Sequence, residues 1–218
     1  MSRQGDDESR KQQIRAAAVR CFVRRGFSAT RLLDIARQAG LSKGGVYFYY
    51  NTIEALFEVV LDAQRAQIEA RWAFTPGGDG PADVTLERLV IAHLRTIEDD
   101  PDDTRLHHLL VSMAPQEGPF RDKLVDGTRI LRDLYAQVID RGVREGVFND
   151  GEADHLADVV LAMVQGLAAQ TALHPEGRLL VRPEAAAATV LSMLAPRDAS
   201  VSVPAGLEAP ATRPALQS

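Results

Sequence analysis

A run of cap and turn residues in the first quarter of the chain constrains its fold more than any other feature. Gly40 separates two short stretches whose apolar residues have helical spacing, and glycine enters a tight turn at little steric cost. Thr30 can cap the first stretch and Ser42 the second, because each side chain carries an oxygen that accepts a backbone N–H. The spacing therefore predicts helices over 31–38 and 42–49, joined by a tight turn.

The rest of the chain has helical periodicity as well. Apolar residues recur every three or four positions, and no stretch alternates apolar and polar residues for long enough to predict a strand. We expect an all-α chain of about nine helices, over 9–25, 31–38, 42–49, 53–72, 84–98, 102–112, 119–145, 152–172 and 184–194. The interpretation gives a three-helix helix-turn-helix domain over 9–55 and a C-terminal helical domain over 56–196. Residues 197–218 are rich in Pro, Ala and Ser, which predicts a disordered tail.

Composition excludes several classes of protein. Hydrophobic residues make up 45% of the 218 positions and charged residues 25%, which is ordinary for a globular protein. No apolar run approaches the roughly 18 residues of a membrane span, and the first residues lack the apolar core of a secretory signal. We therefore expect a cytoplasmic protein with no membrane partner. Cys21 is the single cysteine, so it forms no intrachain disulfide and is predicted to be a small buried hydrophobe.

The charge is distributed unevenly along the chain. Residues 9–50 hold nine basic residues and one acid, Asp34, so this segment carries a net charge of +8. Since the whole chain carries −5, the remainder carries −13. A basic unit on an acidic body suits binding to a phosphate backbone, although a run of like charges can also be a solvated face.

A helix-turn-helix that reads DNA needs an apolar wedge between its two helices and a second helix that can enter the major groove. The Ser42 cap leaves the backbone amides of Lys43, Gly44 and Gly45 facing outward, where phosphate oxygens can accept from them. Two glycines in a helix cost about 1 kcal/mol each, which close approach to DNA would offset. The candidates for the wedge are Leu32, Ile35, Ala36, Leu41 and Val46.

Four aromatic residues follow one another at 47–50. They cannot all point inward, because successive helical residues turn by about 100°. We expect Tyr50 to face the core, Tyr47 and Tyr49 to offer hydroxyls to phosphates, and Phe48 to contact a thymine methyl. The alternative is an aromatic cluster that packs the first helix against the fourth.

Residues 9–63 resemble the DNA-binding domain of the TetR family, the tetracycline-repressor-like transcriptional regulators. The matching positions are Ile14, Ala17, Ala18, Phe22, Gly26, Phe27, Ala29, Thr30, and the segments 34–36, 39–47 and 54–56. The resemblance implies an all-α homodimer that binds double-stranded DNA at a palindromic operator. It further implies a repressor with a variable C-terminal ligand domain, released from DNA by a small-molecule effector that the sequence does not identify.

The resemblance also assigns DNA contacts to the start of the second helix, to the third helix and to the start of the fourth. The matching residues are Arg31, Leu33, Ser42, Lys43, Gly44, Gly45, Tyr47, Phe48, Tyr49 and Thr52. Family members often carry a lysine that binds phosphate just before the Glu-Ala-Leu of the fourth helix. This chain has Ile53 at that position, so Asn51 or Thr52 would have to substitute.

The C-terminal helices must account for dimerisation and for the ligand site. The helices over 152–172 and 184–194 are rich in small residues, which allows close approach across a two-fold axis; the alternative is that they are ordinary core helices of one subunit. A ligand pocket is expected among the fourth to eighth helices. The candidate lining residues are Trp72, His93, Leu109, Met113, Phe120, Tyr135, Met163 and Gln170.

No cofactor is implied, and the five histidines are too scattered to predict a metal site. Two other classes of function stay open at this point: an enzyme whose helix-turn-helix is an accessory, and a protein-interaction module whose basic face binds acidic partners. Against an enzyme, the sequence has no nucleophile elbow, phosphate-binding loop or metal-ligand spacing. We therefore expect a regulator rather than an enzyme.

Overall fold

A computed structural model describes residues 3–72, 80–113, 118–174 and 176–196. The helices are α1 (Arg3–Arg25), α2 (Leu32–Gln38), α3 (Lys43–Tyr47), α4 (Ile53–Trp72), α5 (Ala82–Asp99), α6 (Pro101–Met113), α7 (Gly118–Glu145), α8 (Ala153–Gln170) and α9 (Pro183–Leu194), with a 3₁₀ turn at Thr171–Leu173. These ranges contain nine α-helices and no strand, so the predicted all-α fold is confirmed. The predicted tail, 197–218, lies outside the described residues.

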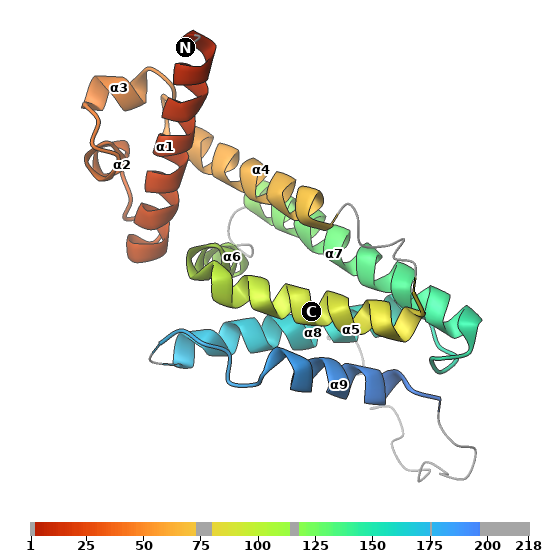
Figure 1. The fold of residues 1–218 in the computed structure, drawn as a ribbon. Helices are drawn as coiled ribbons and strands as arrows, with labels where there is room; N and C mark the ends of the chain where they lie inside the picture. Colours follow the sequence, from red (N-terminus) through yellow and green to blue (C-terminus); the bar gives the residue numbers. More distant parts are fainter. Residues whose placement is uncertain (1–2, 73–79, 114–117, 175, 197–218) are drawn as a thin grey trace, which may run out of the picture.

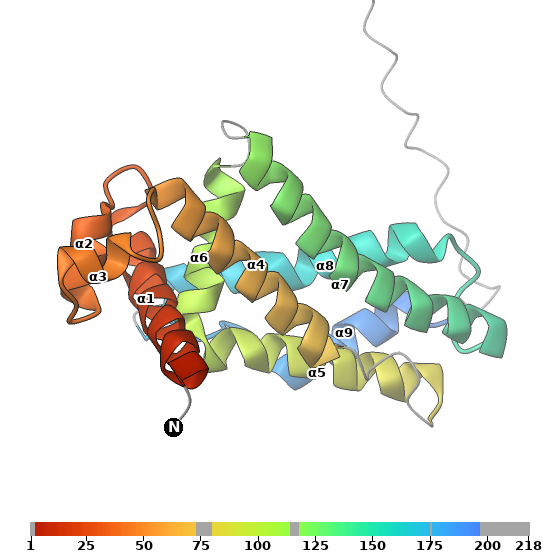
Figure 2. The same ribbon diagram turned by 90° about the horizontal axis from the view of Figure 1, so that it is seen from above.

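The first three helices form a unit at one end of the molecule, here called the head, and α4 to α9 form the body (Figure 1). In the body, α5 packs against α7, α8 and α9, while α8 packs along α7. Figure 2 shows α4 running from the head into the body beside α7. Within the described ranges, no helix combines the length and apolar character needed to cross a bilayer.

The head and the body each have an apolar core. The division between the two cores falls within α4 rather than at a loop. The head core combines α1 residues such as Phe22 with Ile35 of α2 and Val46 of α3. It also takes four side chains from the first half of α4 and two from α6, which contacts α1 directly: Leu56, Phe57, Val60, Leu61, Leu106 and Leu110. The first three helices therefore do not close this core alone; α4 and α6 complete it.

Some helix ends differ from the predicted ones. Helix α1 begins at Arg3 rather than near position 9, and ion pairs between Lys11 and Asp7 (3.0 Å) and between Arg15 and Glu8 (3.2 Å) lie along the added turns. Helix α3 ends at Tyr47 rather than Tyr49. Shifts of this size at helix ends depend on side-chain partners that periodicity does not show.

The acidic stretch after α5 forms the start of α6. The Asp100 carboxylate accepts the Asp103 amide at 3.0 Å, and Pro101 occupies the first helical position. Proline fits there because the first amides of a helix have no intrahelical acceptor.

Helix α7 ends in a turn that folds back on the helix. Gly146 has φ of 72°, and the Val147 amide donates to the Gly142 carbonyl at 3.0 Å. Phe148 is then buried against Gly142, where an added β-carbon would come within 2.1 Å of the Phe148 ring. Residues 147–148 therefore return over the last turn of this helix.

Candidate functional site

The turn between α2 and α3 has the geometry that its glycine predicts. Gly40 has φ of 66°, and the Leu41 amide donates to the Ala36 carbonyl at 2.9 Å. The side-chain amide of Gln13, on α1, donates to the Ala39 carbonyl at 2.7 Å. The turn is therefore fixed both by its own backbone and by the neighbouring helix.

The predicted wedge lies inside the head core. Leu32, Ile35, Ala36 and Val46 are buried, and Leu41 packs against them. This packing fixes the angle between α2 and α3, and it leaves the outer face of α3 at the surface of the head.

The start of α2 differs from the prediction. The cap position is Arg31, whose amide donates to the Asp34 carboxylate at 3.2 Å. Thr30 is buried instead, and its hydroxyl donates to the Gly26 carbonyl at 2.6 Å. Asp34 also pairs with Arg25 at 2.8 Å, an interaction that holds the pKa of its carboxyl below the usual range. The prediction of Thr30 as the cap was wrong because this hydroxyl binds the end of α1.

Ser42 caps α3 as predicted, since its hydroxyl accepts the Gly45 amide at 3.0 Å. The Gly45 amide therefore does not face outward, which corrects one of the three amides expected to be available to phosphate. The Lys43 ammonium lies 5.2 Å from the centre of the Tyr47 ring, a cation–π contact that places a positive charge over an exposed aromatic surface.

The aromatic run divides between surface and core. Phe48 is 81% exposed and Tyr47 40%, whereas Tyr50 is 8% exposed and faces the core as predicted. Tyr49 is half-buried against the head core, and its hydroxyl faces Asp7 of α1, whose hydrogen bond raises the pKa of that hydroxyl. Tyr49 is thus engaged with α1 in a way that Tyr47 and Phe48 are not.

Most of the residues implied as DNA contacts are accessible at the surface of the head. Those that are exposed are Arg31, Leu33, Ser42, Lys43, Gly44, Tyr47, Phe48 and Thr52; Gly45 and Tyr49 are intermediate. The Thr52 hydroxyl accepts the Ala55 amide at 3.1 Å and so caps α4. Ile53, which stands where relatives often carry lysine, packs against the head core.

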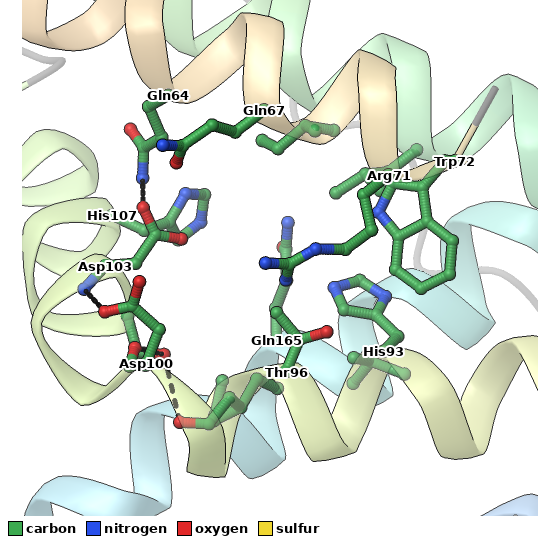
Figure 3. Close-up of a pocket in the computed structure, with 16 residues that line it drawn as sticks. Gln64, Gln67, Arg71, Trp72, His93, Thr96, Asp100, Asp103, His107 and Gln165 are labelled. Atoms are coloured by element: carbon green, nitrogen blue, oxygen red, sulfur yellow. Dashed lines mark hydrogen bonds between the residues drawn. The ribbon is translucent and has the colours of Figure 1, made fainter.

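A second candidate site is a cavity of about 90 Å³ in the body, called here the cavity (Figure 3). It lies where α4, α5, α6, α7 and α8 meet, and side chains from all five helices form its lining. The lining residues are Gln64, Gln67, Ile68, Arg71, Trp72, His93, Thr96, Ile97, Asp100, Asp103, Thr104, His107, Leu131, Val164, Gln165 and Ala168.

One side of the cavity carries carboxylates. The Gln64 side chain donates to the Asp103 carboxylate at 2.9 Å, which links α4 to α6. Burial raises the pKa of Asp103, because the cavity wall disfavours its charged form. Burial likewise lowers the pKa of His107 to about 4, so this imidazole is neutral at pH 7.

The opposite side carries hydrogen-bond donors. His93 Nδ1 lies 3.0 Å from the Tyr135 hydroxyl, and burial lowers the pKa of His93 to about 4. Tyr135 is fully buried and has no other hydrogen bond among the described residues, so its hydroxyl must donate to Nδ1. The neutral imidazole then carries its proton on Nε2. The Trp72 ring stands against that imidazole, with 5.7 Å between the ring centres.

The structure brings only part of the predicted ligand set to this cavity. Trp72 and His93 line it, and Tyr135 lies directly behind His93. Leu109 and Met113 pack against the head core, Met163 packs against the body core and Gln170 is exposed; the Phe120 side chain lies outside the described residues. Prediction missed the polar lining residues Gln64, Gln67, Arg71, Thr96, Asp100, Asp103, His107 and Gln165.

Comparison with known proteins places this geometry in a family. The sequence pattern of bacterial regulatory proteins of the tetR family matches residues 14–60, and that of the BetI-type transcriptional repressor C-terminal domain matches residues 83–196. The chain belongs to the TetR family. It is a DNA-binding transcriptional regulator, and its family is one of regulators rather than of enzymes.

Individual relatives agree with this assignment. The chain is 34% identical over 151 residues to the uncharacterized HTH-type transcriptional regulator YfiR of Bacillus subtilis, covering 65% of this chain and 69% of YfiR. It is 28% identical over 140 residues to the HTH-type transcriptional regulator SrpR of Pseudomonas putida, covering 64% of this chain and 63% of SrpR. The match to SrpR therefore spans less than two thirds of that relative.

Solved structures share the TetR fold over nearly their whole length. A TetR transcription regulator from Haloarcula marismortui superposes with a TM-score of 0.74 at 22% identity, covering 86% of this chain and 99% of that one. A transcriptional regulator from Saccharomonospora viridis, solved in complex with choline, superposes with a TM-score of 0.72 at 23% identity, covering 86% and 95%. At these identities the likeness establishes the fold alone.

Proposed function

We propose that this TetR-family chain is a homodimeric repressor that leaves a palindromic operator when a small molecule binds in the cavity. The observation that carries the proposal is that α4 and α6 line the cavity and also complete the head core. A ligand that changes how these two helices pack therefore changes the support of the DNA-reading unit.

For DNA contact we propose the exposed region around α3. Tyr47 and Phe48 offer aromatic surface beyond the backbone, and Lys43 adds a positive charge beside them. Arg31 and Thr52 stand at the starts of α2 and α4, where the resemblance assigns phosphate contacts. Tyr49 would contribute through its ring edge, because its hydroxyl already faces Asp7.

For the dimer we propose a face formed by α8 and α9. On α8 an exposed stripe at helical spacing consists of His155, Val159, Ala162, Gly166 and Ala169. On α9, Ala188, Ser192 and Met193 are exposed. Small residues let two helices approach closely, and a two-fold axis would place two such pairs in one bundle.

For release from DNA we propose a change in the contact between α4 and α6. The Gln64–Asp103 hydrogen bond crosses from one helix to the other at the cavity wall. Three residues before Gln64, Leu61 enters the head core, and three residues after Asp103, Leu106 does the same. A ligand that competes for Asp103 would favour a dimer state whose heads fit the operator less well.

A gel shift tests this function directly, with a labelled palindrome from upstream of the chain's own gene and a scrambled duplex of equal length. We expect selective binding by a dimer, with affinity that falls steeply as salt rises. Light scattering on the same sample measures the oligomeric state. Equal affinity for palindrome and scrambled duplex at every salt concentration would falsify the proposal.

A further inference from the structure

The cavity has two chemically opposite walls. Asp100 and Asp103 form one, called the acid wall, and Arg71, Trp72 and His93 form the other, called the donor wall. In Figure 3 Arg71 and Trp72 descend from α4 above His93, and the two aspartates lie across the cavity from them. Such an arrangement places acceptors and donors on facing walls of one cavity.

The acid wall has acceptor capacity left over. Within the described residues, the Asp103 carboxylate accepts one hydrogen bond, from Gln64, and makes no ion pair. Asp100 uses one carboxylate oxygen to cap α6. A protonated amine carries three N–H donors, so it could bind both carboxylates at once.

The donor wall has donor capacity left over. Across the described ranges, Arg71 makes no hydrogen bond or ion pair, although its charge is near enough to act on both His93 and Asp103. The tautomer that Tyr135 imposes leaves a proton on His93 Nε2, and the Trp72 indole N–H has no acceptor among the residues described. A carboxylate could accept from the guanidinium and from these N–H groups together.

The rest of the lining mixes aliphatic and polar side chains. Ile97, Leu131 and Val164 add apolar surface that suits a short methylene chain, beside the polar Gln67, Thr96 and Gln165. Because an apolar cavity of about 150 Å³ holds benzene, a cavity of about 90 Å³ suits a compact ligand.

We propose that the effector is an ω-amino carboxylate, a small zwitterion whose ammonium group binds Asp100 and Asp103 and whose carboxylate binds Arg71, Trp72 and His93. This inference rests on the proposed role of the cavity as the effector site. A quaternary ammonium such as choline fits less well, because such groups are bound by aromatic cages and the aromatic pair here lies on the donor wall.

Titration calorimetry on the full chain without DNA tests the ligand class. The probes are unbranched ω-amino carboxylates from glycine to 6-aminohexanoate, each with the alkylamine and the alkanoate of the same length, and choline. We expect one chain length to bind about tenfold or more tightly than both of its single-charge analogues, since each end makes charge-assisted hydrogen bonds.

Two variants assign the ends. Arg71→Gln should reduce the affinity for the amino carboxylate to that for the alkylamine of the same length. Its control is Arg88→Gln, because Arg88 is exposed and lies outside the cavity lining. Asp103→Asn should reduce the affinity for the amino carboxylate to that for the alkanoate of the same length, while the new amide oxygen still accepts the hydrogen bond from Gln64. Its control is Asp99→Asn, at an exposed position. The wild-type ligand series carries the test even if a variant fails to fold.

Three results would overturn the proposed ligand class. The first is an alkylamine or an alkanoate that binds as tightly as every amino carboxylate, the second is tighter binding of choline than of all of them, and the third is no binding by any member of the series.

The gel shift separates failure of the ligand class from failure of the proposed function. Operator binding without any calorimetric signal overturns the ligand class alone. An amino carboxylate that binds as described but leaves the DNA complex intact supports the ligand class and overturns release by this cavity.

Discussion

The head and the body both pack helices around apolar cores, but they place their polar chemistry on opposite sides. In the head the interior is apolar, and the surface residues Tyr47, Phe48 and Lys43 carry the chemistry. In the body, the polar groups of the candidate ligand site line the cavity between helices, where Asp103, His93 and His107 have shifted pKa values. A domain that binds an external partner can have an apolar interior. A domain that binds a small molecule between its helices needs polar side chains in the lining of that site.

The largest expected effect tests how far the head depends on its apolar interior. Phe57 is fully buried, and its ring centre lies 4.7 Å from those of both Phe22 and Phe27. Phe57→Ala should lower the free energy of unfolding by about 3–5 kcal/mol, through lost burial and the cavity it creates. Urea denaturation measures this change, with the exposed Gln67→Ala as reference. Equal stability of the two variants would mean that the head core is not closed.

A second test of packing lies in the body. Gly142→Ala should cost about 1–3 kcal/mol, because its β-carbon would overlap the Phe148 ring. Gly127→Ala, on the same helix with open space around it, should instead be neutral or stabilising by up to about 1 kcal/mol. Thermal melting of both variants makes the comparison. A common sign for the two changes would contradict the packing of Phe148 on Gly142.

The third prediction concerns pH. His93 and His107 have pKa values of about 4 in the fold, below the value of about 6.5 in an unfolded chain. Between these values the unfolded chain binds more protons, so stability should fall as the pH is lowered from 6.5 towards 4. The expected loss is on the order of 1 kcal/mol per histidine, allowing for screening of partly buried rings.

Denaturation at several pH values, compared with the double variant His93→Gln and His107→Gln, measures this contribution. Asp103 changes stability in the opposite sense. Because its pKa is raised in the fold, the folded chain takes up this proton more readily than the unfolded chain, and stability increases as the pH falls. Asp103→Asn removes this contribution and leaves that of the histidines. An unchanged pH dependence in the double histidine variant would place the low-pH loss of stability elsewhere.

The smallest expected effect separates surface function from stability. Tyr47→Ala should weaken operator binding by up to about tenfold, since one exposed contact is lost, while stability changes by less than about 0.5 kcal/mol. Gel shift and thermal melting together measure both quantities. A large drop in melting temperature would assign Tyr47 to the core. The variant Tyr47→Phe shows whether operator binding depends on the hydroxyl or on the ring.

The same contrast explains what could be predicted from the sequence. Local sequence was enough to predict the turn at Gly40, the Ser42 cap and the burial of the Tyr50 side chain. Each of these features depends on neighbours a few residues away. The cap at Thr30 was not, since its hydroxyl binds carbonyls at the end of the preceding helix.

The cavity was largely unpredictable for a related reason. Gln64 and Asp103 are 39 positions apart, and His93 and Tyr135 are 42 apart, so no local spacing connects them. Asp100 caps α6 and also lines the cavity, and this second role could not be read from local sequence. Apolar and aromatic candidates such as Leu109 and Met163 turned out to pack in the two cores.

The contribution of α6 to the head core, far along the chain from the rest of that core, bears on protein engineering. A chimera joined at residue 55 would carry this head without Leu56, Phe57, Val60 and Leu61, and a junction after Leu61 would still leave Leu106 and Leu110 in the other parent. Grafting a new sensor onto this head therefore requires transplanting two separate patches of sequence. Recombination libraries that vary α4 and α6 together should yield folded hybrids more often than those with a single crossover.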